Sequence, residues 1–161
     1  RSFGTMPELA DNLIIIDSVS KRYSACGARI GCIISKNKEL AKQIIKCCQG
    51  RLCSPILEQV GAAALYTTPV SYLEEVNQEY KKRRDTIVAA LKELPGVVAS
   101  DPKGAFYIMV QLPVDDSEKF AIWTLENFTI NNKTVMLAPS NGFCSDPELG
   151  VNEARLAYVL N

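Results

Sequence analysis

Apolar residues near the start of the chain form short unbroken runs instead of alternating with polar residues. One run covers residues 13–16 and stops at Asp17-Ser18, and a second covers residues 30–34 after Gly27. Runs of this length, rich in β-branched residues, are typical of strands covered on both faces, as in a parallel sheet. We therefore expect two buried strands of an α/β sheet in this region.

Helical spacing follows the second run. Asn37 is a suitable N-cap for a helix that ends at Gln49, where four apolar positions share one face. Ser54 followed by Pro55 predicts a capped helix with proline at its first position, ending near Tyr66.

The strongest helical signal covers more than twenty residues. It begins at a capping box from Ser71 to Glu74 and ends at Pro95-Gly96. A coiled coil is the competing interpretation, but a cluster of four basic residues at 81–84 interrupts the apolar positions, and fewer than four heptads are available. The apolar positions with helical spacing are Leu73, Val76, Tyr80, Ile87, Leu91 and Leu94.

The pattern after this helix changes to α+β. We expect strands at residues 105–112, 134–138 and 154–160, and a helix at residues 117–128. The predicted organisation is therefore an α/β part at 1–68, a long interdomain helix at 69–96 and a small α+β domain at 97–161. Two buried-type strands and two helices cannot cover each other's faces. Because the chain also starts without methionine and stops on a predicted strand, we expect a fragment.

Composition narrows the possible functions. Eighteen basic and eighteen acidic residues cancel, so neither nucleic acid nor a membrane surface is an expected partner. No apolar run could span a bilayer and no leader is visible, so a cytoplasmic location is predicted. Histidine is absent, which excludes histidine bases and histidine-ligated metals, and no metal is expected. The six cysteines lack metal-ligand spacing and are expected to be reduced, mostly core thiols: Cys26, Cys32, Cys47, Cys48, Cys53 and Cys144.

A cluster of polar residues follows the first predicted strand, where open α/β sheets place ligands. It contains Ser18, Ser20 and Lys21, and Arg29 comes eight residues after the lysine, between glycines 27 and 31. A phosphorylated aldehyde cofactor needs an amine, hydroxyl donors, a fixed cation and glycines where the backbone turns. Taken singly, these residues would be surface charges and turn formers; taken together, they provide every group that such a cofactor needs.

The pattern Ser-x-Ser-Lys, seven residues, Arg-x-Gly resembles the lysine signature of class I and II aminotransferases, which are fold type I pyridoxal-phosphate enzymes of the aspartate aminotransferase type. Three further segments are similar to family motifs: 103–107 (Lys-Gly-Ala-Phe-Tyr), 135–140 (Val-Met-Leu-Ala-Pro-Ser) and 152–157 (Asn-Glu-Ala-Arg-Leu-Ala). The resemblance implies a carboxyl-terminal fragment of that fold, with the end of the large parallel-sheet α/β domain and most of the small α+β domain. Asn141 departs from the commonest family loop, which puts local loop geometry and substrate preference in doubt.

The resemblance also implies roles for individual residues. Lys21 would form the Schiff base with pyridoxal 5′-phosphate and shuttle the proton, while Ser18 and Arg29 would bind the phosphate, with Ser20 as a weaker candidate. Arg155 would clamp the substrate's α-carboxylate, although a lone arginine near Glu153 could also be a solvated charge at a strand edge. The expected substrates are an amino acid, aspartate or a related one, and a 2-oxo acid, which react by ping-pong chemistry in a homodimer.

Other functions remain possible on the same scaffold. A lyase, decarboxylase or acyltransferase would begin with the same lysine chemistry, although Arg155 argues against decarboxylation because it would clamp the leaving group. An aminotransferase-like sensor domain of a transcription regulator is the alternative from another class. The family's acidic partner for the pyridine nitrogen, its ring-stacking aromatic residue and its upstream phosphate loop have no counterparts here. We therefore expect the fragment alone to be inactive.

Overall fold

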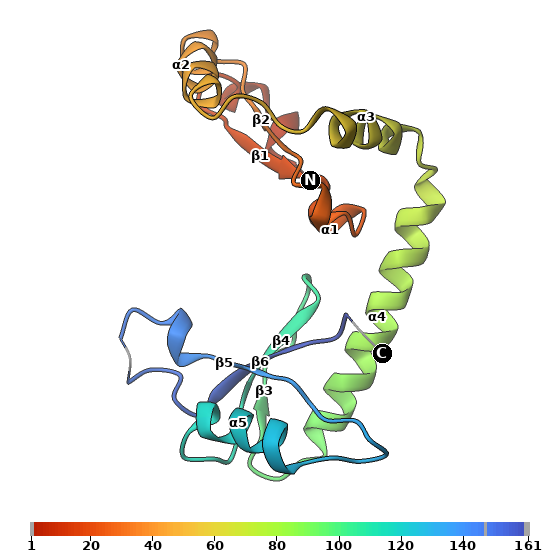
Figure 1. Ribbon diagram of the computed structural model, residues 1–161, viewed down its shortest axis with the longest axis vertical. Coiled ribbons are helices and arrows are strands. Elements are labelled where there is room, and N and C mark those ends of the chain that lie inside the picture. Colours follow the sequence, from red (N-terminus) through yellow and green to blue (C-terminus); the bar gives the residue numbers. More distant parts are fainter. Residues whose placement is uncertain (1, 147, 160–161) are drawn as a thin grey trace. The chain divides into compact units, whose positions relative to one another are not determined.

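The computed structural model describes residues 2–146 and 148–159. The chain divides into two compact units, Arg1–Leu73 and Glu74–Asn161, and each is described by itself (Figure 1). The boundary between them falls inside the long helix α4 (Val70–Lys92). The three-part division that the sequence suggested, with a separate interdomain helix, stays a prediction.

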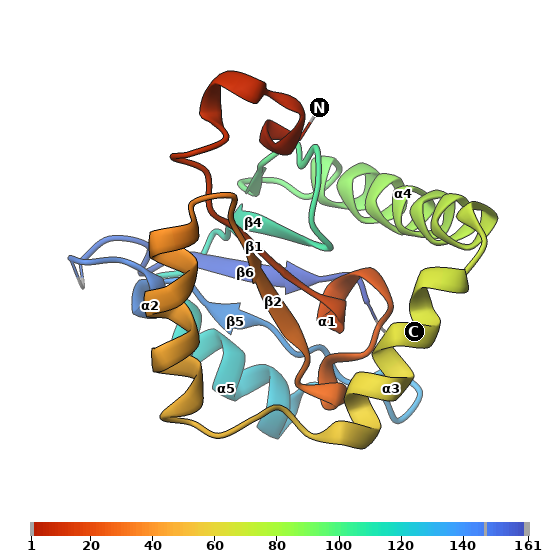
Figure 2. The same ribbon diagram turned by 90° about the horizontal axis from the view of Figure 1, so that it is seen from above.

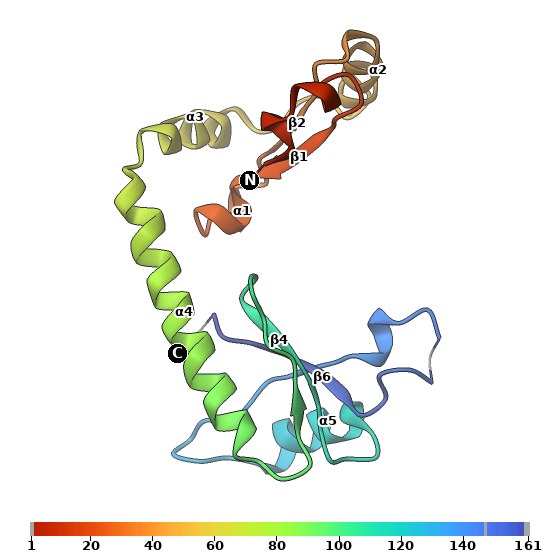
Figure 3. The ribbon, with the colours of Figure 1, turned by 180° about the vertical axis from the view of Figure 1, so that it is seen from behind.

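The first unit contains a pair of short strands and several helices. Strand β1 leads directly into the one-turn helix α1, and strand β2 leads into α2 and α3 (Figure 3). In chain order the elements are η1 (Phe3–Thr5), η2 (Pro7–Leu9), β1 (Ile15–Ser18), α1 (Val19–Arg22), η3 (Cys26–Ala28), β2 (Gly31–Ile34), α2 (Lys38–Gln49), α3 (Ile56–Ala64) and η4 (Leu65–Thr67).

Strands β1 and β2 pair antiparallel, with Ile15 opposite Ile34 and Ser18 opposite Gly31. These two strands are therefore not parallel neighbours of each other. Their connection holds only one turn of α-helix and a 3-10 turn, whereas a parallel crossover usually needs a full helix. The prediction that both strands are buried is also wrong for the described chain: Ile16 is 80% exposed, and no described residue of this unit is buried.

The helices of the first unit partly follow the predicted signals. Asn37 caps α2 as predicted, because its side-chain oxygen accepts a hydrogen bond of 3.0 Å from the backbone N–H of Leu40. Helix α3 begins one residue later than expected: Pro55 occupies the cap position and Ser54 does not cap the helix. The predicted capping box at Ser71 is also wrong, since α4 already begins at Val70.

The second unit is built on a four-stranded antiparallel sheet with the order β3-β4-β6-β5. Three of these strands are labelled side by side in Figure 2. Helix α5 (Ser117–Asn127) packs near β5 and matches its predicted range. The strands are β3 (Val98–Ala99), β4 (Tyr107–Gln111), β5 (Ala138–Pro139) and β6 (Glu153–Ala157). Strand β3 was not predicted, and β5 is shorter than expected.

The hydrophobic core of the described chain lies in the second unit. It joins the end of α4 to the sheet through Leu91, Ile108, Val110, Ala154 and Tyr158. Ile108 and Val110 are each 1% exposed, because alternate residues of β4 point to the same face of the sheet. Helix α4 ends at Lys92, earlier than the stop predicted at Pro95-Gly96. Gly96 lies in the turn before β3 and adopts a φ of 76°, a conformation that glycine tolerates.

The cysteines are free thiols, but they are not in the core as predicted: five are exposed and Cys144 is half-buried. The five exposed cysteines all belong to the first unit, where no described side chain is buried. Among the described helices, none is both long enough and apolar enough to cross a bilayer.

Candidate active site

Lys21 lies on α1, the single helical turn that follows β1. Ser18 caps this turn: its Oγ accepts a hydrogen bond of 3.1 Å from the backbone N–H of Ser20. At the other end, the N–H of Tyr23 donates to the carbonyl of Val19 at 3.1 Å. Lys21 is exposed at the carboxyl end of β1. The sequence therefore places one amine and two serine hydroxyls within four residues of a capped turn, at positions 18, 20 and 21.

The strand pair brings this turn beside the start of β2. The N–H of Val19 donates to the carbonyl of Ile30 at 3.3 Å, and Ser18 pairs with Gly31. A Cβ atom on Gly31 would lie only 3.0 Å from the carbonyl oxygen of Asp17, so a side chain there would push the strands apart. The glycine of the Arg-x-Gly motif thus permits the close approach of the two segments.

Arg29 occupies the loop just before β2, in the left-handed region with φ 54° and ψ 36°. Its Nη1 donates to the carbonyl of Cys26 at 2.9 Å, which fixes the side chain against its own loop. Among the described residues, no carboxylate forms an ion pair with Arg29. The exposed guanidinium is therefore available to an external anion.

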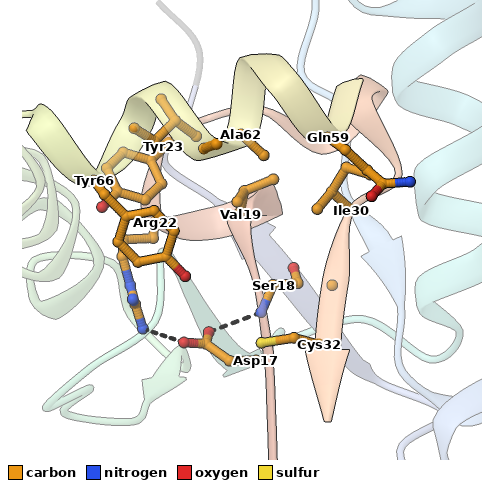
Figure 4. A pocket seen from close by; sticks show the side chains of 13 residues that line it. Asp17, Ser18, Val19, Arg22, Tyr23, Ile30, Cys32, Gln59, Ala62 and Tyr66 are labelled. Carbon is orange, nitrogen blue, oxygen red and sulfur yellow. Dashed lines mark hydrogen bonds and ion pairs between the residues drawn. The ribbon is translucent and has the colours of Figure 1, made fainter. Parts of the chain in front are cut away.

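Asp17 and Arg22 flank the Ser-Val-Ser-Lys segment and were not identified from the sequence. The carboxylate of Asp17 accepts from the backbone N–H of Ser18 at 2.7 Å and from Nη2 of Arg22 at 2.6 Å (Figure 4). Opposite charges on both sides of the segment are the only sequence signal for this pair.

A pocket of about 260 Å³ borders the same turn (Figure 4). Ser18 lines it, whereas Lys21 and Arg29 do not. Most of its wall is apolar and comes from the two strands, α1 and α3. The lining residues are Asp17, Ser18, Val19, Arg22, Tyr23, Ile30, Gly31, Cys32, Gln59, Ala62, Ala63, Leu65 and Tyr66.

The donor set of the first unit fits a phosphorylated aldehyde. Ser18 uses its oxygen as an acceptor for Ser20, which leaves its O–H able to donate to a phosphate oxygen. Arg29 adds a permanent positive charge, and Lys21 adds an exposed amine one turn away from the serine cap. The structure thus groups Ser18, Ser20, Lys21 and Arg29 in one unit.

Arg155 lies in the second unit, on strand β6, where it pairs with Met109 of β4 and Ala138 of β5. Because β6 has a neighbour on each side, the alternative that Arg155 is a strand-edge charge is wrong. The guanidinium carbon lies 5.2 Å from the ring centre of Tyr107 and 4.8 Å from that of Phe143. Cation–π contacts of this kind favour a fixed orientation.

The half-buried guanidinium of Arg155 forms no ion pair with a carboxylate among residues 2–146 and 148–159. Tyr107 and Phe143 had no assigned role in the sequence, although Tyr107 belongs to a segment that resembles a family motif and Phe143 follows another such segment by three residues. Their aromatic side chains were the available sequence signal for a contact with Arg155. The arrangement can present a positioned guanidinium to a carboxylate.

Backbone contacts hold β6 at both ends. The N–H of Ser140 donates to the carbonyl of Glu153 at 2.9 Å, and the N–H of Tyr158 donates to that of Phe106 at 3.0 Å. The Tyr158 hydroxyl donates to the carbonyl of Ala105 at 3.2 Å. Burial raises the pKa of Tyr158, while the positive charge of Arg84 opposes the rise. Tyr158 therefore stays neutral and anchors the strand that carries Arg155.

Comparison with known proteins identifies the class to which this fold and lysine motif belong. Residues 3–146 match the family described as aminotransferase class I and II. The chain belongs to this family.

Individual relatives give the same assignment. The aspartate aminotransferase of Bacillus subtilis is 30% identical over 155 residues, which cover 94% of this chain and 38% of the relative. The aspartate aminotransferase of Pyrococcus horikoshii is 29% identical over 155 residues, covering 92% of this chain and 37% of the relative. The chain thus spans little more than a third of the length of these relatives.

Solved structures agree on the fold. The alanine aminotransferase of Pyrococcus furiosus matches with a TM-score of 0.73 at 30% identity, over 90% of this chain and 37% of that structure. The kynurenine aminotransferase of Pyrococcus horikoshii matches with a TM-score of 0.75 at 27% identity, over 93% of this chain and 36% of that structure. The predicted fold class, part of a fold type I aminotransferase, is confirmed.

Proposed function

We propose that this chain is part of a longer pyridoxal-phosphate-dependent aminotransferase, called the whole protein below, which moves an amino group from an amino acid to a 2-oxo acid. One observation carries the proposal: Ser18 and Lys21 lie on one capped turn at the end of β1, and Arg29 lies just before the paired strand β2, in a chain of the aminotransferase family. The described complexes of two neighbours, one with PMP and one with N-(5′-phosphopyridoxyl)-L-leucine, support this cofactor.

The cofactor, when bound, supplies an aldehyde that condenses with an amine and a ring that accepts the electron pair of the substrate's Cα–H bond. Lys21 provides the amine and, once released, takes the proton from the substrate's α-carbon. The O–H of Ser18 and the guanidinium of Arg29 hold the phosphate, and the hydroxyl of Ser20 adds a weaker second donor.

Arg155 binds the α-carboxylate of both substrates. A guanidinium can donate two parallel hydrogen bonds to a carboxylate, a geometry that an ammonium lacks. The rings of Tyr107 and Phe143 restrict its orientation. A decarboxylase is disfavoured, because this grip would hold the group that must leave.

Aspartate or a related amino acid is the proposed substrate. The names of several relatives support it, although structural neighbours include alanine, kynurenine and methionine aminotransferases. The homodimer and the cytoplasmic location stay predictions. We expect the 161-residue chain alone to be inactive, because the groups that would hold the cofactor ring have no counterpart among its motifs.

The proposal is tested by Lys21→Ala in the whole protein, with Lys46→Ala on α2 as the control lysine. We expect Lys21→Ala to lower kcat by ~10²–10⁴-fold, the usual contribution of a positioned acid–base group. Borohydride reduction followed by peptide mass analysis should find cofactor on residue 21 of the control and not of the variant. Near-normal turnover by Lys21→Ala would show that the lysine is misassigned.

A further inference from the structure

We propose that Asp17 and Arg22 form a bracket around the turn that carries Lys21, and that both are positioning residues for this lysine. The inference rests on the proposed function, since it assigns what holds the reactive amine in place. Neither residue belongs to the Ser-x-Ser-Lys or Arg-x-Gly pattern.

The turn needs such support because of its length. Helix α1 has only four residues. An isolated helix of one turn is unstable in water, because one hydrogen bond does not offset the conformational entropy lost when the first turn is ordered. The Ser18 cap, the Val19–Ile30 hydrogen bond and the Val19–Tyr23 hydrogen bond hold its backbone. None of these contacts reaches the side-chain face of residues 21–22.

The Asp17 carboxylate connects the two ends of the turn. Its Oδ1 accepts from the Ser18 N–H at 2.7 Å, at the start of the turn, and its Oδ2 accepts from Nη2 of Arg22 at 2.6 Å, at the end (Figure 4). Charge-assisted bonds of this length are stronger than neutral ones. Arg22 follows Lys21 directly, so fixing Arg22 limits how far the backbone of Lys21 can move.

The bracket matters for position more than for stability. The side chains of Arg22 and Asp17 are 51% and 35% exposed, and exposed ion pairs contribute little to folding. Catalysis is more sensitive, since a reacting group displaced by ~1 Å can lose ~10²-fold in rate. A pair that is nearly neutral for folding can therefore still be important for Lys21.

The test compares Asp17→Asn, Arg22→Gln and the double variant of the whole protein with Glu39→Gln, which breaks the exposed Glu39–Lys42 pair on α2. The kcat of each variant is divided by the amount of cofactor that borohydride traps on Lys21. This normalised kcat should fall by about threefold to tenfold in each single bracket variant. The KM for the amino acid and the melting temperature should match those of Glu39→Gln. The double variant should lose no more than either single variant, because both remove one interaction.

A second measurement needs no cofactor. In the cofactor-free protein, amide hydrogen exchange in peptides covering residues 18–23 should speed up in the bracket variants and not in Glu39→Gln. Arg22→Lys should restore part of the lost kcat, since it keeps the charge without the planar fork. Equal exchange and equal kcat in all variants would overturn the bracket.

The Lys21→Ala variant separates the two proposals. If it loses turnover while the bracket variants behave like Glu39→Gln, the bracket fails and the proposed function stands. If Lys21→Ala keeps turnover and trapped cofactor, the proposed function fails and the bracket has no lysine to position. A lower melting temperature with unchanged kcat per trapped lysine would make the pair merely structural, which also overturns the proposal.

Discussion

Two isoleucines in strands illustrate how differently the two units hold their candidate site residues. Ile16 of β1 is 80% exposed, whereas Ile108 of β4 is 1% exposed. Every buried residue of the described chain belongs to the unit that starts at Glu74. The cofactor candidates near β1 are therefore positioned by caps, backbone pairing and one ion pair, while Arg155 is positioned by a packed sheet.

This difference indicates which interactions each site depends on. In the first unit, single hydrogen bonds such as that from the Ser20 N–H to Ser18 Oγ determine the geometry. In the second unit, the hydrophobic core fixes β6, and the aromatic rings beside Arg155 refine its orientation. Substitutions in the two units should consequently affect different measurable quantities.

The largest expected contrast is between the two proposed anion-binding arginines. In the whole protein, Arg155→Ala should lower kcat/KM for both amino and 2-oxo acids, because the charge-assisted hydrogen bonds to the carboxylate are lost. The loss of transition-state stabilisation should be on the order of 2–5 kcal/mol. Arg29→Ala should instead weaken cofactor binding first. Steady-state kinetics and cofactor titration distinguish the two effects.

Arg155→Lys is the matched variant, and it should recover only part of the loss. If Arg155→Ala changes kcat/KM by less than about threefold, under ~1 kcal/mol, the α-carboxylate must bind elsewhere.

A smaller contrast should appear in folding stability. Ile108→Val removes one methylene from the core and should lower the free energy of unfolding of the second unit by about 1 kcal/mol. Ile16→Val should change stability by less than ~0.5 kcal/mol, because the side chain is exposed. Urea titrations followed by far-ultraviolet circular dichroism report both units, and the fluorescence of Trp123 on α5 reports the second unit. Equal losses in both variants would contradict the comparison.

The smallest expected effect concerns folding stability at acidic pH. The backbone N–H of Lys119, with that of Glu118, holds the pKa of Asp116 below its ordinary value at the start of α5. As the pH falls through the ordinary pKa of about 3.9, Asp116 is protonated in the unfolded chain while it is still charged in the folded chain. The contribution of Asp116 is therefore present above that value and is lost as the pH falls through the lowered pKa.

Asp116→Asn keeps an acceptor oxygen and removes the titration. We expect the stability of this variant, followed by Trp123 fluorescence, to fall less steeply below about pH 4 than that of the parent. Identical acid profiles for the two proteins would show that Asp116 does not contribute.

Local signals account for what the sequence predicted well. The Asn37 cap and the range of α5 depend on residues within one turn of each other, so a single segment contains the whole signal. The antiparallel pairing of β1 with β2 and the two-residue strand β3 depend on partners distant in sequence. The exposure of Ile14 and Ile16 could not be predicted from hydrophobicity, because burial depends on what covers the strand.

The candidate site shows the same difference between local sequence signals and contacts that form only on folding. The motif predicted Lys21, Ser18 and Arg29 because their spacing along the chain is fixed by the chemistry that they share. The Asp17–Arg22 ion pair depends on how one turn folds back on the strand end, and the rings beside Arg155 come from separate segments. The sequence supplied the motif residues, while the structure supplied the residues that orient them.

The left-handed backbone of Arg29 has a consequence for how this loop can vary. A residue with a Cβ atom in this conformation carries strain of about 1–2 kcal/mol relative to the right-handed region, from which glycine is exempt. Glycine at position 29 would thus relax the loop while deleting its guanidinium. At position 29, backbone conformation favours glycine, whereas the proposed phosphate contact requires a cation, so stability and the proposed function favour different residues.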